Sequence, residues 1–413
     1  MADRAPQNAA NERNGESRIG RWLAIVVLLL VPLLAISAAE DAVGGIRSII
    51  SGDPSPRPAV RSPGVLDVRT SAGRAVRAEV VASDLDTPWD LALAPDGSLW
   101  FTERGGRVSR LDLDAGTVAV LGQIDVLETG EAGLMGMAFH PSFPQTPTVF
   151  FAHSYRGRRG IRNRLIRATY RDGRLTNPET LVDDIPGRGN HNGSRLTIGP
   201  DRMLYMTMGD AANAGAAQDR NSLSGKILRL TLDGKASPDN PFGNAIWSFG
   251  HRNPQGLAFM SNGRLYATDH GPAEADEVGL IEPGLNHGWP TVRGDCDSGS
   301  EIEFCSSHDV VEPLAEYTPT IGISGLAVYE SDRIPGWRGS LVFTSLRAGT
   351  LLRLVLSENG RAARGQELIL DGDFGRLRDV VVGPDGRLYI ATSNRDGRGR
   401  PASGDDRIIR ITP

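Results

Sequence analysis

A short unit made of a tight turn and two strands recurs along most of the chain. Its turns carry Pro-Asp-Gly or a close variant, as at 95–97 and 384–386. Proline presets φ, aspartate bonds back to the chain, and glycine accepts positive φ. Apolar and polar residues alternate after each turn, as in half-buried strands. Five clear copies and one weaker copy are present, at 94–111, 199–230, 261–281, 339–354, 383–411 and, more weakly, 140–152.

Six such units predict an all-β radial array, and we expect a six-bladed β-propeller over residues 75–413. A sandwich with coincidental turns is the alternative, and the number of similar units disfavours it. We expect a strand near 77–81 to join the last blade and close the ring, because unpaired sheet edges invite aggregation. With 50 glycines, 26 prolines and 6% aromatic residues, the composition indicates many turns rather than long helices.

The N-terminal 41 residues differ from the rest. Residues 1–21 are polar and contain four arginines, whereas 22–39 are almost wholly apolar. A run of this length predicts a membrane anchor, with a cleaved signal peptide as the alternative. In both cases the arginines stay inside and the rest of the chain is exported to the periplasm or another extracytoplasmic space. Residues 42–74, rich in proline and glycine, predict a disordered linker.

Charge and cysteine content narrow the possible functions. A net charge of −5 gives little support to nucleic-acid binding. No Gly-x-Gly-x-x-Gly motif follows a strand, so a nicotinamide or flavin site of the Rossmann type is unsupported. The two cysteines, Cys296 and Cys305, predict a local disulfide in an exported protein, since a metal site would need more ligands.

Two polar, glycine-bearing loops carry candidate catalytic side chains. The loop at 190–194 places His191 just before a strand, and the loop at 249–254 contains Arg252 and Asn253. Histidine can accept a proton near neutral pH, and arginine can hold carboxylates or polarise an oxygen. We therefore predict a redox or hydrolytic site built from loops on a rigid scaffold.

Five further motifs accompany these loops, at 102–104, 133–141, 269–272, 286–290 and 376–379. With all of them in order over about residues 80–412, the chain resembles the glucose/sorbosone dehydrogenase family. These are soluble quinoprotein sugar dehydrogenases that carry pyrroloquinoline quinone (PQQ). The resemblance implies oxidation of an aldose, or a related alcohol, at the anomeric carbon. Electrons would then leave to a periplasmic acceptor, which suits a membrane tether.

The resemblance also implies roles for individual residues. His191 matches the general base that removes the sugar hydroxyl proton while hydride passes to the quinone. Asn190 precedes it, where some relatives carry an aspartate that orients the base. Arg252 and Asn253 match the pair beside the quinone carbonyls, where an arginine can stabilise negative charge. His251 is expected to be structural.

PQQ carries three carboxylates, so its pocket is expected to be cationic. Arg347, Arg376 and Arg378 match the cationic positions of the family. Glu131 stands where relatives carry a glutamine that contacts the cofactor. A carboxylate there is unfavourable beside a tri-anion unless Arg347 or calcium offsets it. An aromatic residue expected over the quinone face, near 317–320, is not evident.

Calcium is the second cofactor that the resemblance implies. The backbone carbonyls of Gly271 and Pro272 match those that hold a Ca²⁺ in contact with the quinone. Glu277 and the carbonyl of His287 occupy the positions of a second calcium site. Hard oxygen ligands of this kind suit Ca²⁺.

Two other functions stay open on the sequence. One is a non-enzymatic ligand-binding propeller that has lost the cofactor, which Glu131 and the absent aromatic residue favour. The other is a calcium-dependent lactone hydrolase, which would need acidic and amide side chains converging on the central channel. Fold similarity alone does not separate these functions from the dehydrogenase.

Overall fold

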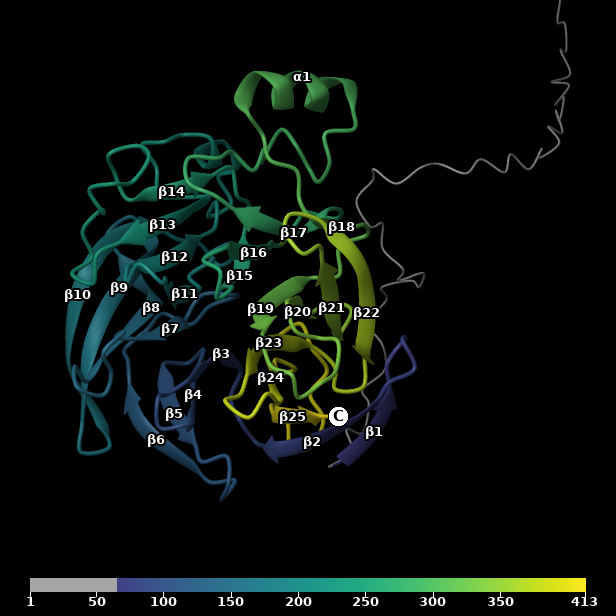
Figure 1. Cartoon of the computed structure of the whole chain (residues 1–413). Helices are drawn as coiled ribbons and strands as arrows, with labels where there is room; N and C mark the ends of the chain where they lie inside the picture. Colours follow the sequence, from purple (N-terminus) through teal and green to yellow (C-terminus); the bar gives the residue numbers. More distant parts are fainter. Residues whose placement is uncertain (1–64) are drawn as a thin grey trace, which may run out of the picture. The chain divides into compact units, whose positions relative to one another are not determined.

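The computed structural model describes residues 65–413. Within them, 25 strands form six antiparallel sheets around a central axis, which is the predicted six-bladed β-propeller (Figure 1). The predicted anchor or signal at 22–39 lies outside the described residues. Every helix within residues 65–413 is too short or too polar to span a membrane.

Five blades contain four strands each, ordered from the axis outward. The first three are β3 (Pro88–Leu93), β4 (Leu99–Glu103), β5 (Arg107–Leu111) and β6 (Val118–Gln123); β7 (Leu134–Phe139), β8 (Thr148–Gly157), β9 (Gly160–Arg171) and β10 (Arg174–Pro186); and β11 (Leu196–Ile198), β12 (Leu204–Met208), β13 (Lys226–Leu230) and β14 (Ile246–Phe249). The next two are β15 (Pro254–Phe259), β16 (Leu265–Asp269), β17 (Asp276–Ile281) and β18 (Ala315–Tyr317); and β19 (Ile323–Tyr329), β20 (Ser340–Ser345), β21 (Thr350–Leu356) and β22 (Ala363–Asp371).

The sixth blade closes the ring with strands from both ends of the described chain. It contains β23 (Leu377–Val382), β24 (Leu388–Thr392) and β25 (Ile408–Thr412), followed by β2 (Ala75–Ala82) and β1 (Val65–Arg69). The pairing of β2 with β25 places Ala78 opposite Ile411, which confirms the expected closing strand. Strand β1 lies within the range 42–74 that the sequence predicts to be a disordered linker. It is a strand because it pairs with β2, and its Leu66 and Val68 side chains pack against the core of this blade.

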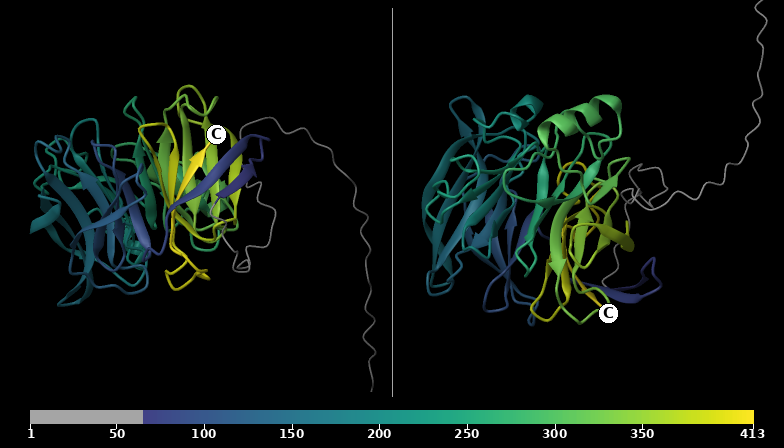
Figure 2. Two further views of the ribbon diagram at one scale, coloured as in Figure 1. Left: turned by 90° about the horizontal axis from the view of Figure 1, so that it is seen from below. Right: turned by 45° about the horizontal axis from the view of Figure 1, so that its top comes forward.

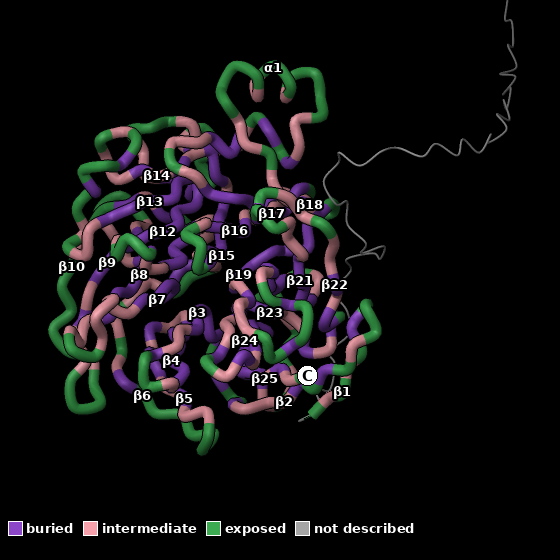
Figure 3. The backbone as a smooth tube through the Cα atoms, in the orientation of Figure 1, coloured by how far each residue is buried: buried purple, intermediate pink, exposed green. Residues whose placement is uncertain are grey.

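Apolar side chains fill the spaces between neighbouring blades. The second strands β4, β12, β20 and β24 are buried along their whole length. Exposed residues gather in the outer strands and loops (Figure 3). Burying apolar surface stabilises a folded protein by about 25 cal/mol per Å². Because much of this surface is buried between blades, the stability of each blade depends on its neighbours.

The two ends of the ring carry different connections, and loops extend from both when the ring is seen from the side (Figure 2). At the end that we call the turn end, tight turns join the first strand of a blade to the second. At the opposite end, the site end, the first strands begin. Register shifts interrupt the pairing at the start of β3, β7, β15, β19 and β23. Bulges of this kind re-aim side chains and are common beside active sites.

A buried ion cluster lies on the axis between the two ends. Arg195 contacts Asp90, and its Nη1 lies 2.9 Å from Oδ2 of Asp379. The carboxylates also accept the backbone N–H groups of Met137, at 2.6 Å from Asp90, and Leu91, at 2.7 Å from Asp379. Burial raises the pKa of Asp90 to about 8. The cluster thus ties the innermost parts of four blades together.

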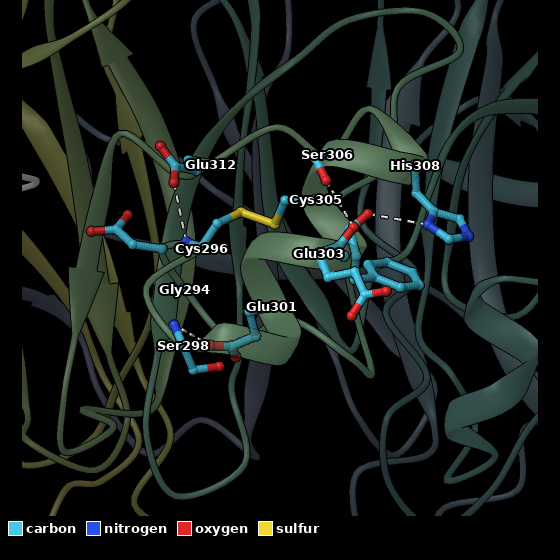
Figure 4. Close-up of a disulfide and its surroundings, with 12 residues drawn as sticks. Gly294, Cys296, Ser298, Glu301, Glu303, Cys305, Ser306, His308 and Glu312 are labelled. Carbon is cyan, nitrogen blue, oxygen red and sulfur yellow. Dashed lines mark hydrogen bonds between the residues drawn. A yellow bond between two sulfur atoms is a disulfide. The ribbon is translucent and has the colours of Figure 1, made fainter.

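A long connection between β17 and β18 contains the helix α1 (Gly299–His308) and the predicted disulfide (Figure 4). Cys296 and Cys305 are bonded, which confirms that prediction. Glu301 accepts a hydrogen bond from the backbone N–H of Ser298 at 3.3 Å, the return half of a capping box. No residue of α1 is buried. The disulfide therefore supplies a constraint that the apolar core does not.

Candidate functional site

A cavity of about 330 Å³ opens at the site end of the axis. Loops from five blades line it, and they bring together residues that lie far apart in the chain. Of the predicted site residues, this cavity contains Glu131, His191, Asn253, Arg347, Arg376 and Arg378. Arg252 lines an adjoining small recess together with the predicted metal ligands Gly271, Pro272, Glu277 and His287.

His191 lies in the loop before β11, with an imidazole held by a carboxylate. Its Nδ1 lies 2.8 Å from Oδ1 of Asp210, and its side chain is 14% exposed. A carboxylate at Nδ1 selects the tautomer that carries its proton there, which leaves Nε2 to accept a proton. The φ of His191 is 56°, in the left-handed region that few non-glycine residues adopt. Such a conformation persists only where its surroundings hold it.

Asp210 is a site residue that the sequence reasoning missed. It follows β12 and is buried. Its Oδ1 also accepts the backbone N–H of Ala212 at 2.8 Å, and its Oδ2 accepts Nε1–H of Trp289 at 2.9 Å. The orienting carboxylate therefore comes from another loop of the same blade, not from the position of Asn190. An acidic residue at the end of a buried strand, as at Asp269 in β16, is the signal that could have revealed it.

Glu131 holds the backbone of the His191 loop. Its Oε2 accepts the N–H of His191 at 2.9 Å, and its Oε1 accepts Nη1–H of Arg398 at 2.6 Å. Burial alone would raise the pKa of Glu131, but the hydrogen bonds from Arg398 and His191 outweigh it and lower that pKa. The offset that we expected from Arg347 or calcium comes instead from Arg398, in the loop between β24 and β25.

The three predicted arginines differ in their partners. Arg376 donates to Oδ2 of Asp396 from Nε at 2.8 Å and from Nη2 at 2.7 Å. Arg378 is buried and donates to Oε1 of Gln255 at 2.9 Å, while its Nε has no partner among the described residues. Burial lowers the pKa of Arg378 to about 10. Arg347 is exposed, and its guanidinium has no hydrogen bond or ion pair within residues 65–413. A buried guanidinium without a carboxylate indicates a place for an anion.

Asp269 holds the second predicted loop in place. Its two oxygens accept the backbone N–H groups of Asn253, at 2.6 Å, and Arg252, at 3.1 Å. The Oδ1 of Asn253 accepts the N–H of Gly193 at 3.1 Å, which joins this loop to the His191 loop. The Nε of Arg252 is buried without a partner among the described residues. The two loops are thus one hydrogen-bonded unit.

The recess beside Arg252 offers oxygen ligands. Burial and, after it, the negative charge of Asp269 raise the pKa of Glu277 well above its ordinary value. The carbonyl oxygens of Gly271, Pro272 and His287 accept no hydrogen bond within residues 65–413. Carbonyls with one carboxylate are ligands that Ca²⁺ prefers. The described chain contains no cluster of three or more His, Cys, Asp or Glu side chains arranged for a metal.

No phenylalanine, tyrosine or tryptophan lines the cavity within the described part of the chain. Tyr317 is buried in β18, where its hydroxyl donates to Oε1 of Gln366 at 2.9 Å. Thr320 lines the cavity instead. His251, expected to be structural, is buried with its Nε2 at 2.9 Å from the Ser248 hydroxyl.

The chain is similar to several known proteins in sequence and in structure. Residues 85–409 match the family model described as glucose/sorbosone dehydrogenase. Quinoprotein glucose dehydrogenase B of Acinetobacter calcoaceticus is 30% identical and aligns with 76% of this chain and 84% of its own length. An aldose sugar dehydrogenase of Escherichia coli K12 is 32% identical and aligns with 79% of this chain and 92% of its own length. The PQQ-bound aldose sugar dehydrogenase of Streptomyces coelicolor superposes with a TM-score of 0.72 at 34% identity, covering 86% of this chain and 99% of that one.

Proposed function

Because the chain belongs to the glucose/sorbosone dehydrogenase family, we propose that this oxidoreductase oxidises an aldose, or a related alcohol, at the anomeric carbon with PQQ as cofactor. One observation carries the proposal. Arg378, a buried guanidinium without a carboxylate partner, lines the same cavity as His191, whose imidazole is held by the buried carboxylate of Asp210. The first suits an anionic cofactor, and the second suits removal of a proton from a hydroxyl.

The cavity residues fit PQQ, which supplies an electron-accepting quinone when it is bound. Arg347 and Arg378, the cations without carboxylate partners, would hold two of its carboxylates, and Arg376 would assist them. Asn253, and Arg252 from the adjoining recess, would lie nearer the quinone carbonyls. The pairing of Glu131 with Arg398 supports this fit, because it leaves no uncompensated negative charge on the cavity wall.

In this proposal, His191 accepts the proton of the sugar hydroxyl at Nε2. The imidazole becomes a cation as it does so, and Asp210 stabilises that cation through Nδ1. Trp289 holds the other carboxylate oxygen of Asp210, which keeps the carboxylate aligned with the ring. Glu131 and Asn253 hold the backbone on either side of the imidazole.

We propose Ca²⁺ as the second cofactor. The carbonyls of Gly271 and Pro272 would hold one Ca²⁺, and the carboxylate of Glu277 with the carbonyl of His287 would hold a second, in the recess that Arg252 also lines. The raised pKa of Glu277 supports a cation there, since a nearby positive charge would stabilise the ionised carboxylate.

We further propose that the protein works outside the cytoplasm, tethered by residues 22–39, and passes electrons to a periplasmic acceptor. The disulfide between Cys296 and Cys305 supports this location, because such bonds persist in oxidising compartments.

A ligand-binding propeller without cofactor is the second candidate. The cavity without a phenylalanine, tyrosine or tryptophan favours it, whereas Glu131 no longer does because Arg398 offsets its charge. A lactone hydrolase has less support, because the axial carboxylates Asp90 and Asp379 both contact Arg195.

Reconstitution separates these functions. The full chain is incubated with PQQ and Ca²⁺, and the reduction of a redox dye is followed with a panel of aldoses. If the protein is the proposed dehydrogenase, at least one aldose should reduce the dye in a PQQ-dependent reaction. Absence of PQQ binding at micromolar concentration would refute it and favour the binding propeller.

A further inference from the structure

Lys226, the first residue of β13, is a buried cation at the site end that the proposed chemistry does not use. Its side chain is fully buried. Its Nζ donates to the carbonyl oxygens of Ala216 at 2.8 Å, Ala217 at 2.9 Å and Ser224 at 2.6 Å. An ammonium group has three N–H donors, so each has one acceptor.

The three carbonyls select the charged form of this side chain. A neutral amine has two N–H groups and a lone pair, and that lone pair would face one of the carbonyl oxygens. Burial lowers the pKa of Lys226 to about 7, while the negative charge of Asp219 favours the ammonium. The carbonyl oxygens, whose dipoles converge on Nζ, favour it as well.

The segment that Lys226 holds is the loop that contains Asp210. This loop, 209–225, is closed at its base by the hydrogen bond from Gly225 N–H to the Gly209 carbonyl at 2.9 Å. The short helix η1 (Ala214–Ala217) provides two of the three carbonyls. Directly after η1, Gln218 donates to the carbonyl of Trp289 at 2.7 Å. Trp289 in turn donates to Asp210.

The same loop contains strained backbone close to Asp210. Ala211 and Ala212 have φ values of 52° and 56°, in the left-handed region. Residues in this region persist only where surrounding contacts fix them. Lys226 holds the same loop further along the chain, at Ala216 and Ala217.

We propose that Lys226 is a positioning residue, whose buried ammonium clamps the loop 209–225 so that Asp210 and Trp289 hold the His191 imidazole. Lys226 lines neither the cavity nor the recess and acts only through this loop. The inference rests on the proposed role of His191 as the base.

The first test needs neither cofactor nor substrate. The indole N–H signal of Trp289, assigned with Trp289→Phe, is recorded by ¹⁵N NMR for the wild-type full chain and for Lys226→Met. We expect the signal to shift or broaden, because Asp210 and Trp289 lose their fixed geometry. Arg229→Met is the matched control, since Arg229 is buried in the same strand but bonds to Asp201 and Asp239. A Trp289 signal that Lys226→Met leaves unchanged would overturn the proposal.

The second test asks whether Lys226 acts through Asp210. With PQQ, Ca²⁺ and an aldose, Lys226→Met should lower kcat by about 10- to 100-fold and change KM little. In an Asp210→Asn background it should cause no further loss, whereas additive losses would contradict the proposal. If the wild type oxidises no aldose, the proposed function fails, and the indole signal still decides the role of Lys226. Should Lys226→Met not fold, Lys226→Gln takes its place in both tests.

Discussion

The two ends of the propeller differ in how closely the blades repeat one another. At the turn end, four blades share one device, in which a side-chain oxygen of Asp96, Asp201, Asn262 or Asp385 accepts the backbone N–H two residues ahead, at 2.9 to 3.1 Å. At the site end, neighbouring loops place different polar side chains toward the axis. The repeated end builds the scaffold, and the loops that depart from the repeat build the site.

The difference predicts that changes at the site end alter chemistry and changes at the turn end alter stability. His191→Ala should remove turnover, by about 100-fold or more, while PQQ binding stays within a few-fold of wild type. Steady-state dye reduction and calorimetric titration with PQQ measure the two effects. His140→Ala is the matched control, because His140 belongs to the turn after β7. Equal turnover in His191→Ala and wild type would exclude His191 as the base.

Arg378→Ala tests the cationic wall of the cavity. Loss of a charged hydrogen bond costs about 1.5 to 3 kcal/mol, so the Kd for PQQ should rise by about 10- to 100-fold. Arg387→Ala, at the turn end beside Asp385, should leave that Kd unchanged. Calorimetric titration provides both constants. An unchanged Kd in Arg378→Ala would mean that the Arg378 guanidinium does not hold the cofactor.

The axial cluster between the two ends should give the protein a pH-dependent stability. An unfolded chain releases the proton of Asp90 near pH 3.8, and the folded chain keeps it to about pH 8. In this window the folded state binds more protons, so this group lowers the free energy of unfolding as pH rises.

Denaturation at pH 5 and pH 8 measures this effect. Asp90→Asn should reduce the fall in stability between the two values. Asp96→Asn should leave the fall in stability unchanged. Hydrogen bonds from Ser98 outweigh burial and lower the pKa of Asp96, so this group is ionised in both the folded and the unfolded chain between pH 5 and pH 8. If the free energy of unfolding falls equally in Asp90→Asn and in wild type, Asp90 is not the group that causes the fall.

The smallest effect is expected at a turn. Gly97 has a φ of 82°, and a Cβ at this position would meet no atom within 4 Å. Gly97→Ala should therefore cost only the penalty of a left-handed backbone conformation for alanine, about 1 kcal/mol, measured by thermal unfolding. Its kcat and its Kd for PQQ should equal those of wild type. A change in either would show that the two ends are coupled.

The sequence predicted the scaffold better than the site, for a physical reason. The turns at 95–97 and 384–386 follow from local backbone preferences, so the repeat and the blade number could be inferred. The pairing of Asp210 with His191 and of Arg398 with Glu131 could not be inferred, because these partners meet only through the folding of a blade or the closure of the ring. Strand β1 was missed because its register with β2, rather than its composition, places it in the sheet.

A crystal structure of the full chain with PQQ and Ca²⁺ tests the account most directly. We predict PQQ at the site end, with carboxylates against Arg347 and Arg378 and with the Nε2 atom of His191 facing the substrate space. PQQ bound elsewhere, or carboxylates that contact neither arginine, would contradict it.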